Sequence, residues 1–289
     1  MREYALSQEQ VKRALSTDYN EPLMRVNPNE YSDRREIPKY RLSEVALYLG
    51  MHERTLHNWF FGYSRSVHGE IRPYPGIIEP ALHNPHGPAL SFYNLAEAQV
   101  LSAIRQKWMV APEVQPLVPG ERPKFGQKPP KHSFIQVSMQ AVRYALEYVT
   151  SEQPLHPLIS QYFYSDGKNL FVRKVEEAIG RHLTVNVSRF GQMAFSSILD
   201  MYLDRIERDK SGPIKVYPLR SVEDEDKSIV IMPNVASGRP TVNGTGIRVE
   251  VIWNRSRAGE TTAELAEDYG IEPRVIEKAI SYFTTVKAA

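Results

Sequence analysis

Several side chains that can hydrogen-bond to nucleic acid are grouped in one short stretch, Tyr40 to Phe61. Arginine and asparagine pair with base edges and phosphates, and histidine can donate to either. At helical spacing, Leu56 and Trp59 face a core while the polar groups between them face outward. This pattern predicts a DNA-reading helix whose outward set is Glu53, Arg54, His57, Asn58 and Phe61.

A first helix and a tight turn must precede the reading helix if the stretch is a helix-turn-helix. Ser43 can cap a first helix in which Val45, Ala46 and Leu49 recur on one face. Gly50 is placed to end it, because glycine readily adopts the left-handed conformation that closes helices. The alternative is an ordinary pair of core helices, since this geometry also occurs in proteins that never bind DNA. The outward polar set favours DNA binding.

The composition is that of a globular protein of about two domains. The chain has 289 residues, of which 42% are hydrophobic and 24% charged, and no run of about 18 apolar residues could span a bilayer. The first ten residues lack the apolar core of a signal peptide. With no cysteine, disulfides and thiolate metal sites are excluded, so we expect a reducing, cytoplasmic compartment.

The net charge of +2 is unevenly distributed along the chain. Residues 37–131 contain 11 Lys and Arg against 7 Asp and Glu, whereas residues 134–289 contain 19 against 20. The positive excess therefore surrounds the predicted helix-turn-helix, where contacts with phosphates would require it.

Irregular segments flank the predicted helix-turn-helix on both sides. Residues 1–36 hold one short helical candidate, residues 8–15, and otherwise suggest a loosely packed, solvated extension in which neighbouring charges cancel. Residues 62–91 are punctuated by proline and glycine, which excludes a helix and favours a long wing or hairpin. Combining the helices with the wing, we expect DNA contacts from Arg41, Arg54, Thr55, His57, Asn58, Arg65 and Arg72.

A strong helix is predicted after the wing. Asn94 is its expected cap, Glu97 completes a capping-box pattern, and Leu101, Ile104 and Trp108 form its expected buried stripe.

The middle of the chain predicts a linker followed by helices and a hairpin. Residues 110–133 contain six prolines and suggest a linker, an exposed loop or a segment that becomes ordered on a partner. A helix is expected at 138–150 and a hairpin turn at 165–168, where an Asp-Gly pair tolerates positive φ. A later apolar stripe would serve either a domain core or a dimer seam; its members are Ile198, Leu199, Tyr202, Leu203 and Ile206.

The C-terminal part predicts short strands and then a second helix-turn-helix. It spans Thr262 to Tyr282, with Thr261 or Thr262 as the cap and Gly270 at its turn. Its last helix exposes a nearly neutral mixture of long charged side chains, which suits protein contact better than DNA. These side chains are Glu272, Arg274, Glu277 and Lys278.

Two stretches resemble known families. The pattern Leu-Ser-Glu-Val-Ala, Leu-Gly, Thr-Leu and Trp of the first helix-turn-helix resembles the start of MerR-family winged helix-turn-helix regulators. The run SGRPTVNGTGIRVEVI and a later Glu-Asp-Tyr are similar to the bacterial domain of unknown function 433. Gly246 stands where that family commonly has arginine, so a role of that arginine does not carry over. The matching positions are Gly238, Arg239, Pro240, Gly244, Thr245, Glu267, Asp268 and Tyr269.

This order of regions resembles longer family members regarded as VapB-type antitoxins, which are encoded beside a PIN-like ribonuclease toxin. The resemblance implies that the chain binds and neutralises such a toxin and represses the shared promoter by binding operator DNA. Paired recognition helices about 34 Å apart would require a homodimer or a higher even-numbered oligomer. The alternative is a stand-alone MerR-like transcriptional regulator without a toxin partner.

Neutralising a PIN-like active site would require covering or distorting a cluster of carboxylates, which arginine and lysine can do. Two segments remain open as the toxin-binding element. One is the 121–131 loop and the other is the C-terminal domain. Their basic residues are Arg122, Lys124, Lys128 and Lys131 in the first, and Arg248, Arg255 and Arg257 in the second.

We therefore expect a mainly α protein with small β elements (α+β). The expected regions are an extension (1–36), a MerR-like winged helix-turn-helix (37–109), a linker (110–133), a helical and hairpin middle with a possible dimerisation role (134–222) and a C-terminal helix-turn-helix domain (223–289). No phosphate-binding loop or catalytic constellation is discernible, so we expect no enzymatic activity, cofactor or metal site.

Overall fold

The computed structural model describes residues 3–5, 31–84, 86–105, 107–110, 133–149, 156–182, 196, 199–218 and 227–287. Within these residues the chain is mainly helical, and its strands form small two-stranded antiparallel sheets. The predicted fold class, mainly α with small β elements, is confirmed. No helix in the described part of the chain is long and apolar enough to cross a membrane.

The first helix-turn-helix consists of α2 (Leu42–Leu49) and α3 (Glu53–Phe60). Gly50 closes α2 in the left-handed conformation, with φ 63° and ψ 41°, as predicted. The prediction that Ser43 caps α2 is wrong, because the helix already begins at Leu42. The N-cap residue is Arg41, and Glu44, at the third helical position, accepts its backbone N–H through Oε2 at 2.8 Å.

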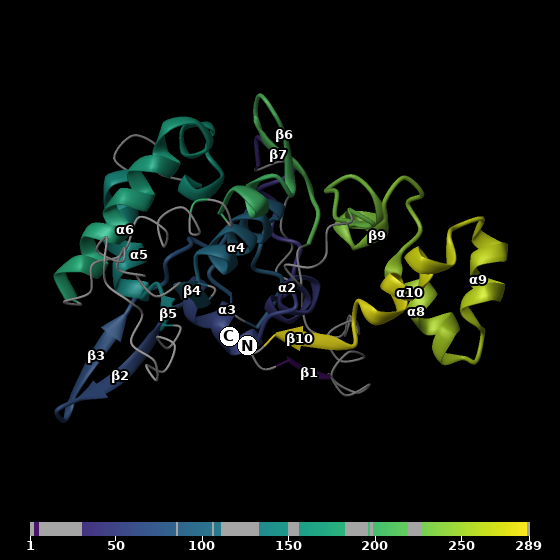
Figure 1. Ribbon diagram of the computed structural model, residues 1–289, viewed down its shortest axis with the longest axis horizontal. Coiled ribbons are helices and arrows are strands. Elements are labelled where there is room, and N and C mark those ends of the chain that lie inside the picture. Colours follow the sequence, from purple (N-terminus) through teal and green to yellow (C-terminus); the bar gives the residue numbers. More distant parts are fainter. Residues whose placement is uncertain are drawn as a thin grey trace, which may run out of the picture.

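A β-hairpin follows α3 directly, as the proline and glycine pattern predicted. Its strands are β2 (Tyr63–Val67) and β3 (Glu70–Tyr74), which pair antiparallel. The hairpin projects from the body of the protein (Figure 1).

Helix α4 (Phe92–Ile104) is the most deeply buried helix of the N-terminal half, with nearly every residue in the core. Its cap is Ser91, and the prediction of Asn94 is wrong by one turn. The Ser91 hydroxyl accepts the N–H of Asn94, and the Asn94 amide oxygen accepts the N–H of Ser91, each at 3.1 Å. Asn94 is therefore the reciprocal partner in the capping box.

Trp108 does not continue the stripe of α4. It lies in β4 (Lys107–Val110), which pairs with β5 (Ser133–Gln136). The two ends of the predicted linker are therefore joined as antiparallel strands. Residues 111–132, and with them Arg122, Lys124, Lys128 and Lys131, lie outside the described residues.

Helices α5 (Met139–Val149) and α6 (Lys168–His182) pack against each other. The hairpin predicted at 165–168 is wrong, because a π-helical turn, η3 (Phe163–Gly167), runs directly into α6. Phe163 and Phe171 are fully buried and their rings meet edge to face, 5.6 Å between centroids. Burial of these aromatic side chains on a helical face outweighs the local turn preference of the Asp-Gly pair.

A second hairpin that the sequence did not predict joins β6 (Ile206–Asp209) to β7 (Gly212–Val216). The apolar stripe that leads into it is buried within the chain, as a core requires. Its described members are Leu199, Tyr202, Leu203 and Ile206, and Ile198 lies outside the described residues.

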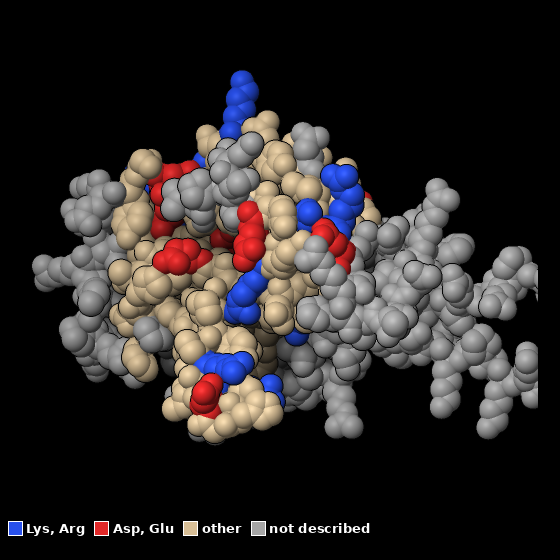
Figure 2. Space-filling model, turned by 90° about the vertical axis from the view of Figure 1, so that its left-hand side faces the viewer, with Lys and Arg blue, Asp and Glu red and all other residues tan. Residues whose placement is uncertain are grey.

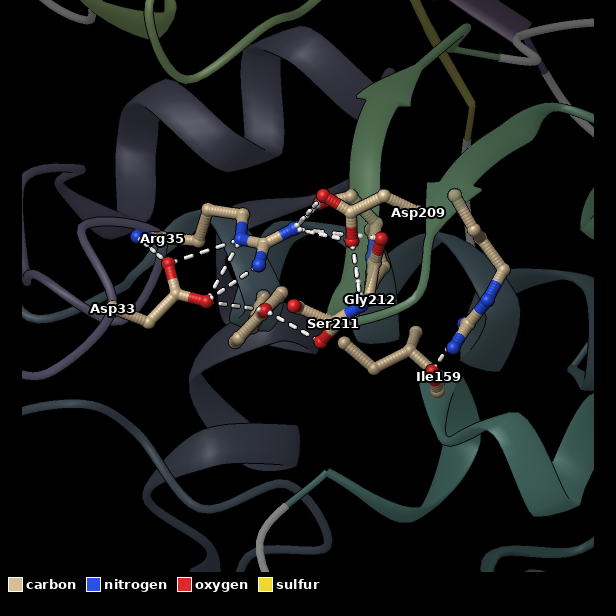
Figure 3. Close-up of polar contacts among 9 residues, drawn as sticks. Asp33, Arg35, Ile159, Asp209, Ser211 and Gly212 are labelled. Carbon is tan, nitrogen blue, oxygen red and sulfur yellow. Dashed lines mark hydrogen bonds and ion pairs between the residues drawn. The ribbon is translucent and has the colours of Figure 1, made fainter.

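Residues 31–36 are held firmly, which corrects the prediction of a solvated loop. Arg35 bonds the carboxylate of Asp33 through Nε at 2.9 Å and that of Asp209 through Nη1 at 3.1 Å (Figure 3). The Tyr93 hydroxyl donates to Asp33 at 2.8 Å. Burial alone would raise the pKa of Asp33, but these bonds hold it below its ordinary value. The segment is thereby fixed to α4 and to the β6–β7 hairpin.

The C-terminal region begins with paired strands β8 (Ile229–Val230) and β9 (Thr241–Val242). Three helices follow: α8 (Val249–Arg257), α9 (Thr262–Tyr269) and α10 (Pro273–Ser281). Thr261 caps α9 and Gly270 closes it at φ 61°, which confirms the second helix-turn-helix. Helix α8 was not predicted.

The two ends of the chain meet, because β1 (Glu3–Ala5) pairs with β10 (Thr285–Lys287). Helices α2, α3 and α4 lie in the middle of the molecule (Figure 1). The β2–β3 hairpin and the helix α9 lie at opposite ends of its long axis.

Candidate nucleic-acid interface

Helix α3 presents a polar face above a fully buried one. Leu56, Trp59 and Phe60 are buried, so the helix is anchored along one side. Arg54 is exposed, and three further predicted contact residues are partly exposed: Thr55, His57 and Asn58. The His52 ring caps the helix, its Nδ1 accepting the N–H of Arg54 at 3.1 Å. Arg54 therefore projects from the first turn of α3, the part of a recognition helix that approaches base edges.

Two glycines allow the hairpin to leave and rejoin the end of α3. A side-chain carbon at Gly62 would lie 2.3 Å from the Tyr74 carbonyl oxygen, and one at Gly76 would lie 2.3 Å from the Phe60 carbonyl oxygen. After the hairpin, the N–H of Ile77 donates to the carbonyl of Trp59 at 2.6 Å. The hairpin is consequently fixed beside α3, at the position of the predicted wing.

The hairpin turn consists of two residues with positive φ, His68 at 52° and Gly69 at 85°. Such two-residue turns match the twist of the adjoining strands and fix their register. The register places Arg65 directly opposite Arg72. At the base, the Tyr63 and Tyr74 rings stack with centroids 5.0 Å apart.

The pair Arg65–Arg72 is electrostatically unfavourable by itself, because like charges directly opposite each other destabilise a strand pair. Glu70 approaches Arg72 at 3.5 Å, but both side chains are mostly exposed, so this contact contributes little. No carboxylate in the described part of the chain forms an ion pair with Arg65. An anion bound between the two guanidinium groups would relieve the repulsion.

Exposed apolar groups accompany these arginines. Ile71, whose strand partner is Ser66, is 77% exposed, and Tyr63 is 41% exposed. In the view of Figure 2, basic side chains occur at several separate places with acidic ones among them. The described surface in that view carries both charges and is not uniformly basic. Binding of phosphates would therefore depend on individual arginines such as Arg65 and Arg72.

Arg41 differs from the other predicted DNA contacts. It lies at the start of α2, partly buried, with its Nε enclosed by the protein. It is therefore less accessible than Arg54, Arg65 and Arg72, which are all exposed. His83 lies outside this surface and contacts Glu79 at 2.6 Å. No group of three His, Cys, Asp or Glu residues among those described is arranged to hold a metal ion.

The three predicted toxin-binding arginines of the C-terminal domain all belong to α8 or its cap, but they differ in availability. Arg248 is about half exposed and lies 3.9 Å from Glu250. Arg257 is exposed and lies over the ring of Trp253. Both remain accessible to a partner.

Arg255 is engaged within its own domain. It donates to Glu260 through Nε at 2.8 Å, forms an ion pair with Asp268 and lies over the ring of Tyr269. The hydrogen bond to Glu260 is the main reason why the pKa of Arg255 is raised. Two of the three residues in the Glu-Asp-Tyr motif thus hold Arg255 against α9. Apart from the motif itself, no pattern in the sequence indicated this pairing.

Known proteins resemble both halves of the chain. Residues 38–117 match a family described as "Putative DNA-binding HTH domain", and residues 229–283 match the family of unknown function DUF433. A protein of Mycobacterium tuberculosis named "Putative antitoxin VapB45" is 28% identical over 255 residues, covering 86% of this chain and 94% of its own length. The resemblance to VapB-type antitoxins is confirmed.

A solved structure shares the architecture. The crystal structure of Rv2018 from Mycobacterium tuberculosis superposes with a TM-score of 0.55 at 22% sequence identity, over 84% of this chain and 98% of that one. At this identity the likeness concerns the fold alone.

Proposed function

We propose that this chain is a DNA-binding antitoxin that represses its own promoter and neutralises a PIN-like ribonuclease partner. The observation that carries the proposal is that the polar face of α3 lies beside a hairpin in which Arg65 is directly opposite Arg72. The reading helix alone would be a weak indication, because many helix-turn-helix units never touch DNA. The hairpin adds an independent element, because Arg65 lies opposite Arg72 and forms no ion pair with a carboxylate in the described part of the chain.

In this account α3 enters the major groove. Arg54 and Asn58 can hydrogen-bond base edges, arginine preferring guanine and asparagine preferring adenine. Thr55 and His57 lie beside them on α3 and contact the backbone or a neighbouring base. Arg65 and Arg72 bind phosphates, and this contribution is independent of sequence and weakens with salt.

A repressor of this kind acts as a dimer, with two copies of α3 about 34 Å apart on a two-fold operator. The stripe that includes Leu199 and Tyr202 is buried within the chain. The dimer contact is therefore assigned to another surface.

The partner is assigned to the C-terminal domain or to the 121–131 segment. The name of the relative, an antitoxin, supports a toxin partner. The separation of the β2–β3 hairpin and α9 along the long axis supports simultaneous use of two surfaces (Figure 1). Arg248 and Arg257 are the accessible candidates on α8 for pairing with carboxylates of a ribonuclease site. Arg255 would first have to leave Glu260 and Asp268.

This function requires binding and no catalysis by the chain itself, so we assign it no enzymatic activity. Purified protein should not degrade RNA in the presence of magnesium, with a mock purification as the control.

The test is to co-express the chain with the product of the adjacent gene and to measure both activities on the same preparation. We expect copurification, inhibition of ribonuclease activity and protection of the upstream DNA. Arg54→Ala with Asn58→Ala should abolish DNA protection and leave inhibition intact. If no neighbouring protein copurifies while DNA is still protected, the chain is a stand-alone regulator. If the double variant stays folded and loses both activities, the two surfaces are not separate.

A further inference from the structure

One motif of the C-terminal domain takes no part in the surfaces described above. Gly238, the first residue of the Gly-Arg-Pro motif 238–240, is the last of three successive residues with positive φ. These are Ala236 at 49°, Ser237 at 57° and Gly238 at 78°. Residues other than glycine rarely adopt this region, and a run of them persists only where the surrounding structure fixes it. The contacts of this turn therefore indicate what fixes it.

The turn contacts the segment that leads into the first helix-turn-helix. The Tyr40 hydroxyl donates to the carbonyl of Gly238 at 3.0 Å, and this bond is buried. Lys39 Nζ donates to the carbonyl of Pro233 at 3.0 Å. A side-chain carbon at position 238 would lie 2.1 Å from the Tyr40 hydroxyl oxygen. Positive φ favours glycine at position 238, and the close approach of Tyr40 excludes a side chain there.

Arg239 extends the same contact to α2. Its Nη1 lies 3.0 Å from Glu250 Oε2, and its Nη2 lies 4.0 Å from Glu44 Oε1. Glu44 also accepts the backbone N–H of Arg41, the N-cap residue of α2. The Glu44 carboxylate, in the first turn of α2, therefore also faces Arg239 of the C-terminal domain. Both side chains are mostly buried, so this attraction is weakly screened by solvent.

The other end of α2 is held by the same domain. The Tyr282 hydroxyl, just beyond α10, donates to the backbone carbonyl of Tyr48 at 2.5 Å, and this bond is also buried. The C-terminal domain therefore contacts both ends of α2. Gly238 and Arg239 bind Tyr40 and Glu44 at its start, and Tyr282 binds Tyr48 near its end.

We propose that Gly238 and Arg239 form a clasp by which the C-terminal domain binds α2, and that this clasp fixes the orientation of α3 relative to the C-terminal domain. The clasp recognises two features of a helix-turn-helix. One is a tyrosine hydroxyl two residues before the helix, and the other is the carboxylate at the third helical position. Gly238 and Arg239 are positioning residues that act on α3 through α2.

The proposal extends beyond DNA binding and neutralisation, and its test uses neither. Because the chain has no cysteine, two can be introduced and spin-labelled without background. We choose Glu53→Cys on α3 and Glu267→Cys on α9, both exposed. Pulsed electron spin resonance then measures the distribution of distances between the two labels. The labelled but otherwise unchanged chain should give one narrow distribution.

Gly238→Ala should broaden this distribution at least twofold in width. The matched control is Gly244→Ala in the same domain, where φ is nearly the same, +81°, but no atom lies within 4 Å of the added carbon. The control should keep the narrow distribution. Adding Tyr40→Phe to Gly238→Ala should recover part of the narrow component, because it removes the closest clashing atom.

A narrow distribution in Gly238→Ala would overturn the proposal, as would equal broadening in both glycine variants. If Gly238→Ala does not fold, the double variant Tyr40→Phe, Arg239→Ala carries the test, since it removes the hydrogen bond and the ion pairs without adding atoms. It should broaden the distribution, and an unchanged narrow distribution would contradict the clasp.

Discussion

The two helix-turn-helix units of this chain share one local construction. Gly50 and Gly270 close the first helix of each with nearly the same dihedral angles, φ 63° and ψ 41° against φ 61° and ψ 36°. Glu44 and Glu264 occupy the third position of each first helix, and each accepts the backbone N–H of the capping residue at 2.8 Å. Aligned on these residues, Arg274 corresponds to Arg54.

The two units differ in the segment that comes after the second helix. Helix α3 leads into the β2–β3 hairpin with its opposed arginines, whereas α10 leads into Tyr282, which bonds back to Tyr48. The second unit also exposes Glu272 and Glu277, which would repel phosphates. The comparison teaches that capping and turn residues specify the scaffold, and that the two units differ in the segments that flank it and in the charges that they expose.

The largest expected effect is on the free energy of unfolding, and it follows from the different buried residues of α3 and α10. Trp59 is a buried residue of α3, whereas the corresponding position in α10 is the smaller Ala279. Trp59→Ala should lower the free energy of unfolding by about 3–5 kcal/mol, because it opens a cavity that the surroundings cannot fill. Urea denaturation measures this change. A loss below about 1 kcal/mol would mean that α3 is not packed as described.

The next effect concerns the tie between the two units. Tyr282→Phe leaves the buried carbonyl of Tyr48 without this donor and should cost about 1–3 kcal/mol of unfolding free energy. Tyr74→Phe, in the half-exposed wing, is the matched control and should stay within about 0.5 kcal/mol. Equal costs at the two positions would show that the hydroxyl of Tyr282 does not join the units in solution.

A smaller effect distinguishes the two caps. Thr261 caps α9 with its hydroxyl, which accepts the N–H of Glu264 at 3.2 Å, so Thr261→Ala should cost about 1 kcal/mol. Ser43, which the sequence suggested as the cap of α2, lies inside that helix. Ser43→Ala should therefore change the unfolding free energy by less than about 0.5 kcal/mol. Thermal melts of both variants measure these values, and a larger cost at Ser43 would restore it as the cap.

We expect the free energy of unfolding to depend on pH through a buried pair, Glu97 and His156, outside the second helix-turn-helix unit. Glu97 of α4 is buried and contacts His156 Nδ1 at 2.9 Å. Burial opposes protonation of His156, but the bond to Glu97 and its charge raise the pKa of His156 above 6.5. On the Glu97 carboxyl group burial has the opposite effect and raises the pKa. Both groups therefore hold protons more tightly in the folded state.

The stabilising contribution of His156 is thus fully present below pH 6.5 and is lost as the pH rises through the raised value. The free energy of unfolding, measured in urea on either side of this range, should fall toward higher pH. His156→Asn should flatten the dependence. A decline that persists unchanged in this variant would place its origin in a group other than His156.

Local signals in the sequence were sufficient for both helix-turn-helix units, because each rests on a turn glycine and a short apolar pattern. They failed where packing outweighed local preference. The Asp166-Gly167 pair favours a turn, yet the buried rings of Phe163 and Phe171 keep the segment helical. Asn94 is a good cap residue, yet Ser91 stands in the right place one turn earlier.

The contacts between the two units were beyond sequence reasoning, because they join residues far apart in the chain. Tyr40 shows no local sign of its bond to Gly238. The one available signal was the glycine of the Gly-Arg-Pro motif, since a glycine outside a helix end often marks a close approach of another group. That signal indicates that something approaches Gly238 without identifying Tyr40.

The most direct measurement compares matched double variants of the two second helices. Labelled DNA from upstream of the gene is titrated with Arg54→Ala, Asn58→Ala and with Arg274→Ala, Lys278→Ala, and fluorescence anisotropy reports the affinity. The first variant should lose about 2–6 kcal/mol of binding free energy, since each specific base contact contributes about 1–3 kcal/mol. The second should bind within about 0.5 kcal/mol of the unchanged chain. If both variants are folded, equal losses, or a loss only in the second, would contradict the assignment of DNA reading to α3.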